Sequence, residues 1–437
     1  MPFKLIEATT RATAGLRLLG KDVCFVIAAV AAPLVIFATE AGATTELVLQ
    51  IDSSWRYDSN PLRFTEDADV QAILATGGKS DTLQANDLRV ELVQPLDSPE
   101  TRLVFVAQLG NRNYRQMSQL DNIEYAYRMA FEWRLGDLWT GKLLHMQEQQ
   151  LYDYLNGALT TRDMLHRTTS SADLVLQVSP TIQIPLALRI QRSQYDTLAN
   201  SVFDYHERDV DVGVRFLNGG GSNINFGLRS AEVSFPQRTG AILTSLDSGY
   251  LDSEIYFASD WQYSALTRFS TRISEMQRRY ATLNSRDFSA TTAELRILHN
   301  YSPKTVLGVS FWSRPYGITD STALYTMNTG TQIDASWRAS EKTRLMLYTR
   351  KERQRYQYVD LTQGHLSTEF DQRRAGGSIG YTASPDVQLY VAGFRDQVDP
   401  SNSGVRIFQN TLRVGIEYTF ENISGLAQRD GFRLPKK

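Results

Sequence analysis

Apolar and polar residues alternate along most of this chain with the period of a β-strand. In the segment Ile123–Arg134, one face would carry Ile, Tyr, Tyr, Met, Phe and Trp, and the other Glu, Ala, Arg, Ala, Glu and Arg. Because successive side chains of a strand point to opposite faces, such a segment has one apolar face and one charged face. No convincing helical period follows Leu47. The same alternation recurs at 181–191, 208–216, 223–229 and 411–420.

Short turns rich in Gly, Pro, Asn and Asp alternate with longer polar connections, as in outer-membrane barrels. With both termini on the side of the short turns, nine long connections imply about 18 antiparallel strands. The turn between strands expected at about 253–263 and 264–280 is not clear in the sequence, which leaves 16 strands as the alternative. The nine longer connections lie near 58–85, 111–122, 150–170, 193–207, 231–252, 281–290, 316–328, 357–368 and 397–405.

Composition favours a membrane barrel over a soluble all-β fold. A sandwich or propeller would bury Leu, Ile and Val in a packed core and would carry fewer charges on every polar face, and no propeller-like repeat is visible. A mean hydropathy of −0.32 excludes a polytopic helical membrane protein, but not a barrel with a polar lumen. The formal net charge of −2 argues against nucleic acid as a partner. The predicted fold class is all-β, a transmembrane antiparallel up-and-down β-barrel.

The N-terminal region has the pattern of a secretory signal. Basic residues within 1–22 precede an apolar stretch at 23–38, and Ala41-Gly42-Ala43 follows as an A-x-A cleavage pattern. A single membrane anchor is the alternative, but the apolar stretch is short for the roughly 20 residues of a span. We therefore predict a signal peptide at 1–43, a barrel at 44–420 in the bacterial outer membrane and a periplasmic tail at 421–437.

The strand predicted at 411–420 ends in Tyr418 and Phe420. A terminal Tyr-x-Phe resembles the C-terminal assembly signal of bacterial outer-membrane barrels, which implies the barrel-assembly machinery as a partner. In this chain the tail 421–437 follows the signal, whereas the signal usually ends the chain.

Four stretches resemble EpsL-type outer-membrane barrels, which are associated with exopolysaccharide biosynthesis and export. The segment Trp55-Arg-Tyr-Asp-Ser-Asn-Pro-Leu-Arg-Phe64 is similar to the YDSN-x-x-R opening of that family. The other stretches are Tyr125–Gly136, Ser285–Ser289 and Asn300–Thr305. The resemblance covers essentially the whole chain after residue 43 and is a pattern of strands and turns. It implies a porin-like barrel for polysaccharide passage and no catalytic residues.

The polar faces of the predicted strands supply the candidates for a pore lining. Arginine can bind carboxylates in a bidentate way, and both charge signs together can hydrogen-bond sugar hydroxyls. The alternative role for each charge is a cross-strand ion pair that stabilises the wall. Tyr256 and Trp312 are further luminal aromatic candidates for stacking on sugars. The pore-lining candidates are Arg128, Arg134, Arg189, Arg215, Arg229, Arg268, Arg272, Arg296, Arg413, Glu124, Glu132, Asp209, Asp211, Glu294, Glu417, Tyr348 and Tyr390.

Export of exopolysaccharide without a chemical step is the predicted function, and a general diffusion porin is the alternative. A constriction loop folded inside the lumen would suit the porin, and 58–85 or 231–252 is long enough to form one. An outer-membrane enzyme is a third possibility, but none of the five histidines lies in a catalytic motif. We expect no cofactor and no metal site, because the one cysteine, Cys24, lies in the N-terminal apolar stretch and no metal-ligand cluster is visible. The expected partners are outer-membrane lipid, lipopolysaccharide, polysaccharide and periplasmic export proteins.

Overall fold

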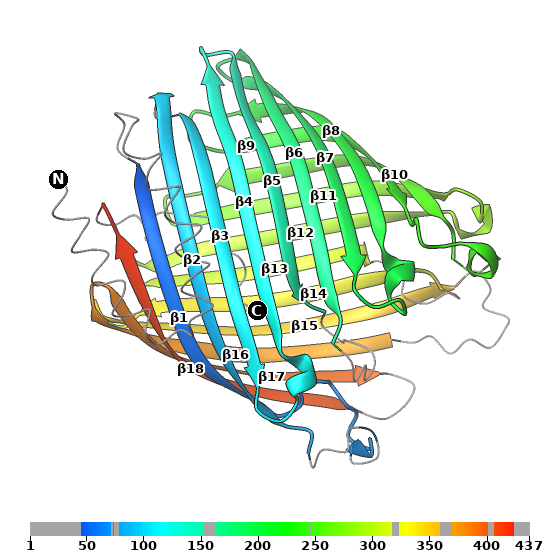
Figure 1. Cartoon of the computed structure of the whole chain (residues 1–437). Helices are drawn as coiled ribbons and strands as arrows, with labels where there is room; N and C mark the ends of the chain where they lie inside the picture. The colour runs from blue at the N-terminus through cyan, green and yellow to red at the C-terminus, as the bar shows by residue number, and fades with distance from the viewer. Residues whose placement is uncertain are drawn as a thin grey trace.

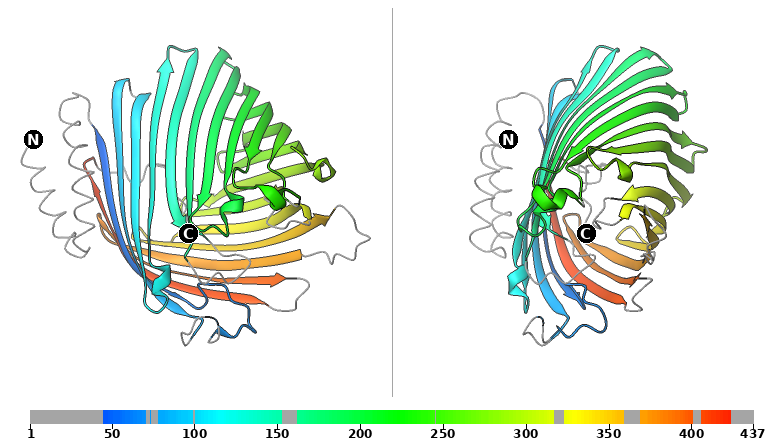
Figure 2. Two further views of the ribbon diagram at one scale, coloured as in Figure 1. Left: turned by 45° about the vertical axis from the view of Figure 1, so that its right-hand side comes forward. Right: turned by 90° about the vertical axis from the view of Figure 1, so that its right-hand side faces the viewer.

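A closed barrel of 18 antiparallel strands forms the molecule (Figure 1 and Figure 2). The computed structural model describes residues 45–70, 73, 78–98, 100–152, 162–244, 246–316, 323–358, 369–400 and 406–423. Consecutive strands pair with each other, and β1 (Glu46–Asp58) closes the ring by pairing with β18 (Ile407–Glu421). The predicted fold class, an all-β up-and-down barrel, is confirmed.

The other strands run in sequence order around the ring, and four short 3-10 helices lie in the described parts of the connections between them. The strands are β2 (Asp81–Ser98), β3 (Thr101–Tyr114), β4 (Asn122–Leu135), β5 (Trp139–Leu151), β6 (Met164–Ser179), β7 (Ile182–Tyr195), β8 (Tyr205–Leu217), β9 (Asn223–Ser234), β10 (Gly249–Gln262), β11 (Thr267–Tyr280), β12 (Phe288–Ser302), β13 (Thr305–Tyr316), β14 (Ala323–Arg338), β15 (Thr343–Tyr358), β16 (Glu369–Ser384) and β17 (Val387–Pro400). The 3-10 helices are η1 (Ser118–Leu120), η2 (Ser201–Phe203), η3 (Gly240–Thr244) and η4 (Asn284–Arg286).

The alternative of 16 strands is wrong, because a tight turn separates β10 from β11. The backbone N–H of Ser264 donates to the carbonyl of Thr267 at 3.2 Å, and the N–H of Thr267 donates back at 3.3 Å. No glycine or proline marks this turn, which is why its sequence gave no clear signal.

Short turns and long loops lie at opposite ends of the barrel, as the alternation of connections predicts. We call these the short-turn end and the long-loop end. The first strand begins at the short-turn end with Glu46, and the last strand returns there with Glu421. Among the described residues no helix is long and apolar enough to cross a membrane. The predicted signal peptide and most of the predicted tail lie outside the described residues.

An apolar belt covers the outer face from the short-turn end upward. On β8, the outward side chains Phe216, Val214, Val212 and Val210 are 40–46% exposed although they are apolar. Arg208 follows them toward the long-loop end. Large exposed apolar side chains of this kind are the outer surface of a transmembrane barrel, where lipid and not water is the solvent.

Three loops at the long-loop end share one arrangement, and each follows the last tyrosine of a strand. The backbone N–H of that tyrosine donates to an aspartate located just before the next strand, which closes a short loop around a 3-10 helix. The pairs are Tyr114 with Asp121 at 2.7 Å, Tyr195 with Asp204 at 2.8 Å and Tyr280 with Asp287 at 2.8 Å. Successive pairs lie four strands apart.

A second aspartate, near the start of the preceding strand, binds each of these loops. Asp247 accepts hydrogen bonds from the N–H and hydroxyl of Thr282 at 2.8 and 2.9 Å, and from the N–H of Leu283. Burial disfavours the charge of Asp247, but these hydrogen bonds hold its pKa below the usual range. Asp81 binds Gln116 and Met117, and Asp163 binds Thr197 and Asn200, in the corresponding places.

Candidate functional site

The inner face of the wall is identified by a hollow of about 470 Å³ that spans β8 to β13. Its lining includes Arg215, Asn225, Asp260, Arg272 and Arg296, one from each of the strands β8 to β12. A hollow that crosses this many neighbouring strands lies on the concave side of the sheet. The side chains of these residues therefore define the inner face, and the exposed apolar belt lies on the other face.

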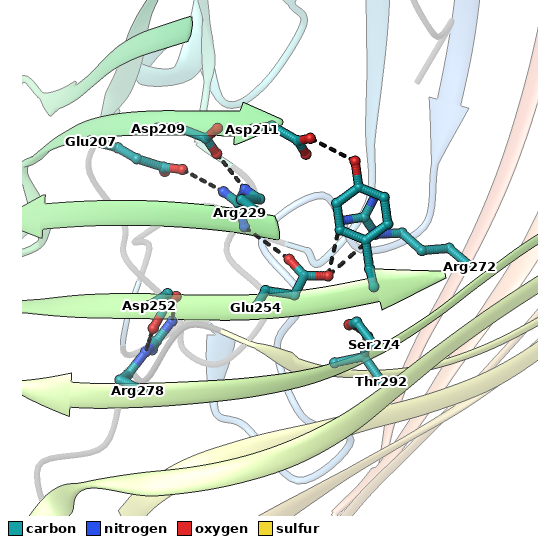
Figure 3. Close-up of polar contacts among 11 residues, drawn as sticks. Glu207, Asp209, Asp211, Arg229, Asp252, Glu254, Arg272, Ser274, Arg278 and Thr292 are labelled. Carbon is teal, nitrogen blue, oxygen red and sulfur yellow. Dashed lines mark hydrogen bonds and ion pairs between the residues drawn. The ribbon is translucent and has the colours of Figure 1, made fainter. Parts of the chain in front are cut away.

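Arg229 on β9 is the centre of a carboxylate cluster on the inner face (Figure 3). It donates to Glu207 at 3.0 Å and to Asp209, both on β8, and it lies 3.6 Å from Glu254 on β10. Glu254 also pairs with Arg272 on β11 at 2.9 Å. The side chain of Asp209 is 4% exposed, so its charge depends on Arg229 and hardly on water. Two arginines thus balance three carboxylates across four strands.

Tyr256 on β10 lies flat against the wall next to this cluster. Its hydroxyl donates to Asp211 at 2.6 Å and accepts from the side-chain amide of Asn225 at 3.1 Å. The guanidinium of Arg272 lies 3.7 Å from the ring centroid, a cation–π geometry. On β9, a Cβ added to Gly227 would lie 2.3 Å from the ring. Because Gly227 has no side chain, the ring of Tyr256 fits in the space beside it. The ring is packed there and is not free to stack on a sugar.

A second ion pair lies closer to the long-loop end. Arg278 on β11 donates to both oxygens of Asp252 on β10, each at 2.7 Å, and both side chains are buried (Figure 3). The Arg278 guanidinium also lies 3.6 Å from the ring centroid of Tyr250. Bidentate pairing fixes the guanidinium in one orientation and neutralises the carboxylate.

Arginine, carboxylate and aromatic ring are combined again where β17, β18 and β1 meet. Arg413 on β18 pairs with Asp52 on β1 at 2.6 Å, and its guanidinium lies 5.3 Å from the ring of Tyr390. The hydroxyl of Tyr390 donates to the same Asp52 at 2.9 Å. Gly415 lies opposite Tyr390 in the β17–β18 register, and a Cβ added to it would lie 2.5 Å from the tyrosine ring.

Strands β13 to β15 carry the same combination of arginine, carboxylate and aromatic ring. Arg350 pairs with Glu352, and its guanidinium lies 4.8 Å from Trp312. The indole N–H of Trp312 donates to Asn328 at 3.3 Å, and Gly330 leaves room for the indole ring. The inner wall therefore carries both charge signs, largely neutralised in place by ion pairs within a strand or between neighbouring strands.

The structure places all of the predicted pore-lining residues on inward positions of the strands. Arg229, Asp209 and Arg272 belong to one cluster, and Arg268 pairs with Asp260 at 3.4 Å. Arg134 lies at the short-turn end, where it pairs with Asp137 at 3.2 Å. The remaining predicted residues are distributed around the ring and do not form one site. That these residues line a conducting pore stays a prediction.

Several inner-face charges escaped the sequence reasoning. Asp252 lies one position before the strand expected at about 253–263, and Arg278 lies inside the strand expected at about 264–280, so the alternation of Glu254 and Arg272 extends to both. Arg63 lies in the β1–β2 loop with φ of 54° and reaches the buried Asp396 on β17 at 3.3 Å. Its only signal in the sequence is its place as the arginine of the YDSN-x-x-R stretch. Its position depends on loop folding and not on strand period.

Four of the five histidines lie in the described part of the chain, and their strand positions face outward. His145 contacts Ser170 at 2.9 Å and Tyr127 at 3.4 Å on the outer face. His166 contacts Asp196 at 2.8 Å. His206 and His299 also occupy outward positions, and His365 lies outside the described residues. Among the described residues there is also no group of three or more His, Cys, Asp or Glu that could hold a metal ion.

The outward aromatic side chains include Tyr418 and Phe420, which face outward near the end of β18. They pair in register with Ile51 and Leu49 of β1, so the predicted assembly signal lies at the seam where the barrel closes. Its recognition by the assembly machinery stays a prediction.

Solved structures similar to this chain are bacterial outer-membrane proteins. OccK9 (OpdG) of Pseudomonas aeruginosa matches with a TM-score of 0.50 and 10% identity over 86% of this chain and 98% of that chain. The FrpB iron transporter of Neisseria meningitidis matches with a TM-score of 0.46 and 11% identity over 88% and 83%. The ferric enterobactin receptor PfeA of P. aeruginosa matches with a TM-score of 0.45 and 8% identity over 87% and 81%. No protein-family model matches the chain, and no curated protein matches its sequence. The fold is thus that of a porin-like barrel of the Gram-negative outer membrane.

Proposed function

We propose that this barrel is a passage for a hydroxyl-rich polysaccharide across the outer membrane, without a chemical step. The observation that carries the proposal is the charge arrangement of the inner wall. Arginines and carboxylates are abundant but neutralise each other between strands, as in the Arg229 and Arg413 clusters. Such a wall offers many hydrogen-bond donors and acceptors without the single-sign field that selects small ions.

Two further features support a polymer. The arrangement of arginine, carboxylate and aromatic side chain recurs at Tyr256, Tyr390 and Trp312. Hydrogen-bonding groups are therefore available around much of the barrel circumference. The rings lie flat against glycines, which keeps them close to the wall and out of the passage. The resemblance of the sequence to EpsL-type barrels indicates exopolysaccharide as the polymer and export as the direction.

Single-channel recording tests the proposal. The full chain would be reconstituted in planar bilayers, with candidate exopolysaccharides added to either side and their monomeric sugars as the matched control. We expect open-channel steps that one polymer interrupts at concentrations at which its monomers have no effect. Steps indifferent to every polymer would instead support a general diffusion porin. The absence of any conductance would contradict both functions.

A further inference from the structure

An outward-facing hollow of about 200 Å³ lies on β7, β8 and β9. Arg192 from β7, His206, Glu207 and Arg208 from β8, and Glu232 from β9 line it. Except for Glu207, whose carboxylate pairs with Arg229 on the inner face, these residues have the same strand parity as the exposed apolar residues Ile190, Val210 and Leu228, so the hollow belongs to the outer surface.

The position of the hollow along the barrel axis can be read from the apolar belt. On β7, outward Ile184, Leu186, Leu188 and Ile190 precede Arg192 toward the long-loop end. On β8, outward Phe216 to Val210 precede Arg208 in the same direction. The hollow therefore begins where the apolar belt stops, which is the level of lipid head groups on the long-loop side.

The cations in this hollow are not neutralised as those of the inner wall are. Arg192 and His206 lie directly opposite each other in the β7–β8 register, and neither arginine of the hollow has an ion pair among the described residues. Arg208 lies opposite Glu232 in the β8–β9 register without forming an ion pair within 4.0 Å. The guanidinium groups of Arg192 and Arg208 therefore have no ion-pair partner in the described part of the chain.

We propose that this hollow binds a phosphate group of a membrane-anchored lipid, the phosphorylated glycolipid of the outer leaflet. Two guanidinium groups are well suited to phosphate, because each can donate two parallel hydrogen bonds. The apolar residues below the hollow would contact the acyl chains of the same lipid. Phosphate and acyl chains are thereby recognised together, so the partner is a lipid and not a free anion.

Native mass spectrometry of the full chain in detergent, with diphosphoryl lipid A as the probe, tests this proposal. We expect Arg192→Gln and Arg208→Gln each to weaken binding by about tenfold, since each removes a charged hydrogen-bonding group. Glu232→Gln is expected to strengthen binding, because it removes the carboxylate that lies on an outward position of the hollow, whereas Glu207 pairs with Arg229 on the inner face. The opposite signs separate an electrostatic site from a general loss of folding. Lys304→Gln and Lys342→Gln, in turns at the short-turn end, are the matched controls and should leave affinity unchanged.

Two comparisons identify the source of the phosphate. Dephosphorylated lipid A and inorganic phosphate should both bind at least about tenfold more weakly than diphosphoryl lipid A. Equal binding of dephosphorylated lipid A would overturn the proposal, because the acyl chains alone would then explain it. Equal binding of inorganic phosphate would overturn the lipid as the partner. Unchanged affinity in both arginine variants would overturn the site.

Discussion

Replacing Arg229 by glutamine tests whether the inner-wall charges are a stabilising network. The substitution leaves Glu207 and Asp209 without their arginine, while Glu254 keeps Arg272. Removing one partner of a buried ion pair costs about 3–5 kcal/mol, because the remaining charge is left uncompensated. Asp209 is 4% exposed, so this range applies to it and we expect a loss of about 3 kcal/mol in the free energy of unfolding.

The matched control is Arg268→Gln on the same face of the neighbouring wall. Arg268 and Asp260 form a single pair at 3.4 Å whose side chains are 53% and 42% exposed. Exposed pairs of this kind contribute about 0.2–1 kcal/mol, so the control should lose at most about 1 kcal/mol. The double variant Arg229→Gln/Asp209→Asn should recover much of the loss, since it removes the uncompensated charge.

Reversible urea unfolding in lipid vesicles, followed by tryptophan fluorescence, measures these free energies. The reversal potential across a bilayer with a KCl gradient gives an independent readout, because Arg229→Gln adds one net negative charge to the wall and should shift selectivity toward cations. Equal losses in the Arg229 and Arg268 variants would refute the reasoning. A loss unaffected by Asp209→Asn would do the same.

Two further predictions concern the packed rings and the long-loop end. Gly330→Ala would place a Cβ 2.1 Å from Trp312, so the indole should move into the lumen and lower the single-channel conductance. The control is Gly219→Ala, whose Cβ would meet nothing within 4 Å and should leave the conductance unchanged. The pKa of Asp247 lies below its usual range, so its contribution to loop stability is complete above about pH 4 and is lost as the pH falls through the folded-state pKa. Pepsin cleavage within 281–287, normalised to an unfolded peptide, should therefore rise as the pH falls from about 4 to 2 in the parent and stay level in Asp247→Asn. A level profile in the parent would contradict the assigned role of this carboxylate.

Alternation identified the strands well where one face meets lipid and the other meets the lumen. The segment 123–134 lies within β4, and 411–420 lies within β18. The strands extend further toward the long-loop end than predicted, since β7 continues to Tyr195 and β2 begins at Asp81. Above the apolar belt both faces are polar, as at Arg192 and Arg208, so the period disappears although pairing continues.

The sequence alone did not predict which residues each charged side chain contacts. Arg229 contacts residues of β8 and β10 because the register brings Asp209 near it and places Glu254 directly opposite. That register depends on turn geometry across several hairpins. The composition of the inner face was therefore predictable, whereas the sharing of one arginine by three carboxylates was not.

The recurrence of one loop arrangement every four strands has a consequence for how such a barrel can change width. Four strands return the chain to the same end and the same direction. One four-strand unit extends from Asp81 to Asp163 and the next from Asp163 to Asp247. Such a unit can be gained or lost without reversing any later strand. Loss of one strand would reverse all that follow. Since barrel diameter grows roughly linearly with strand number, duplication of one unit would widen the lumen by about a fifth. Gene duplication within the chain would thus change the size of the permitted cargo in discrete steps.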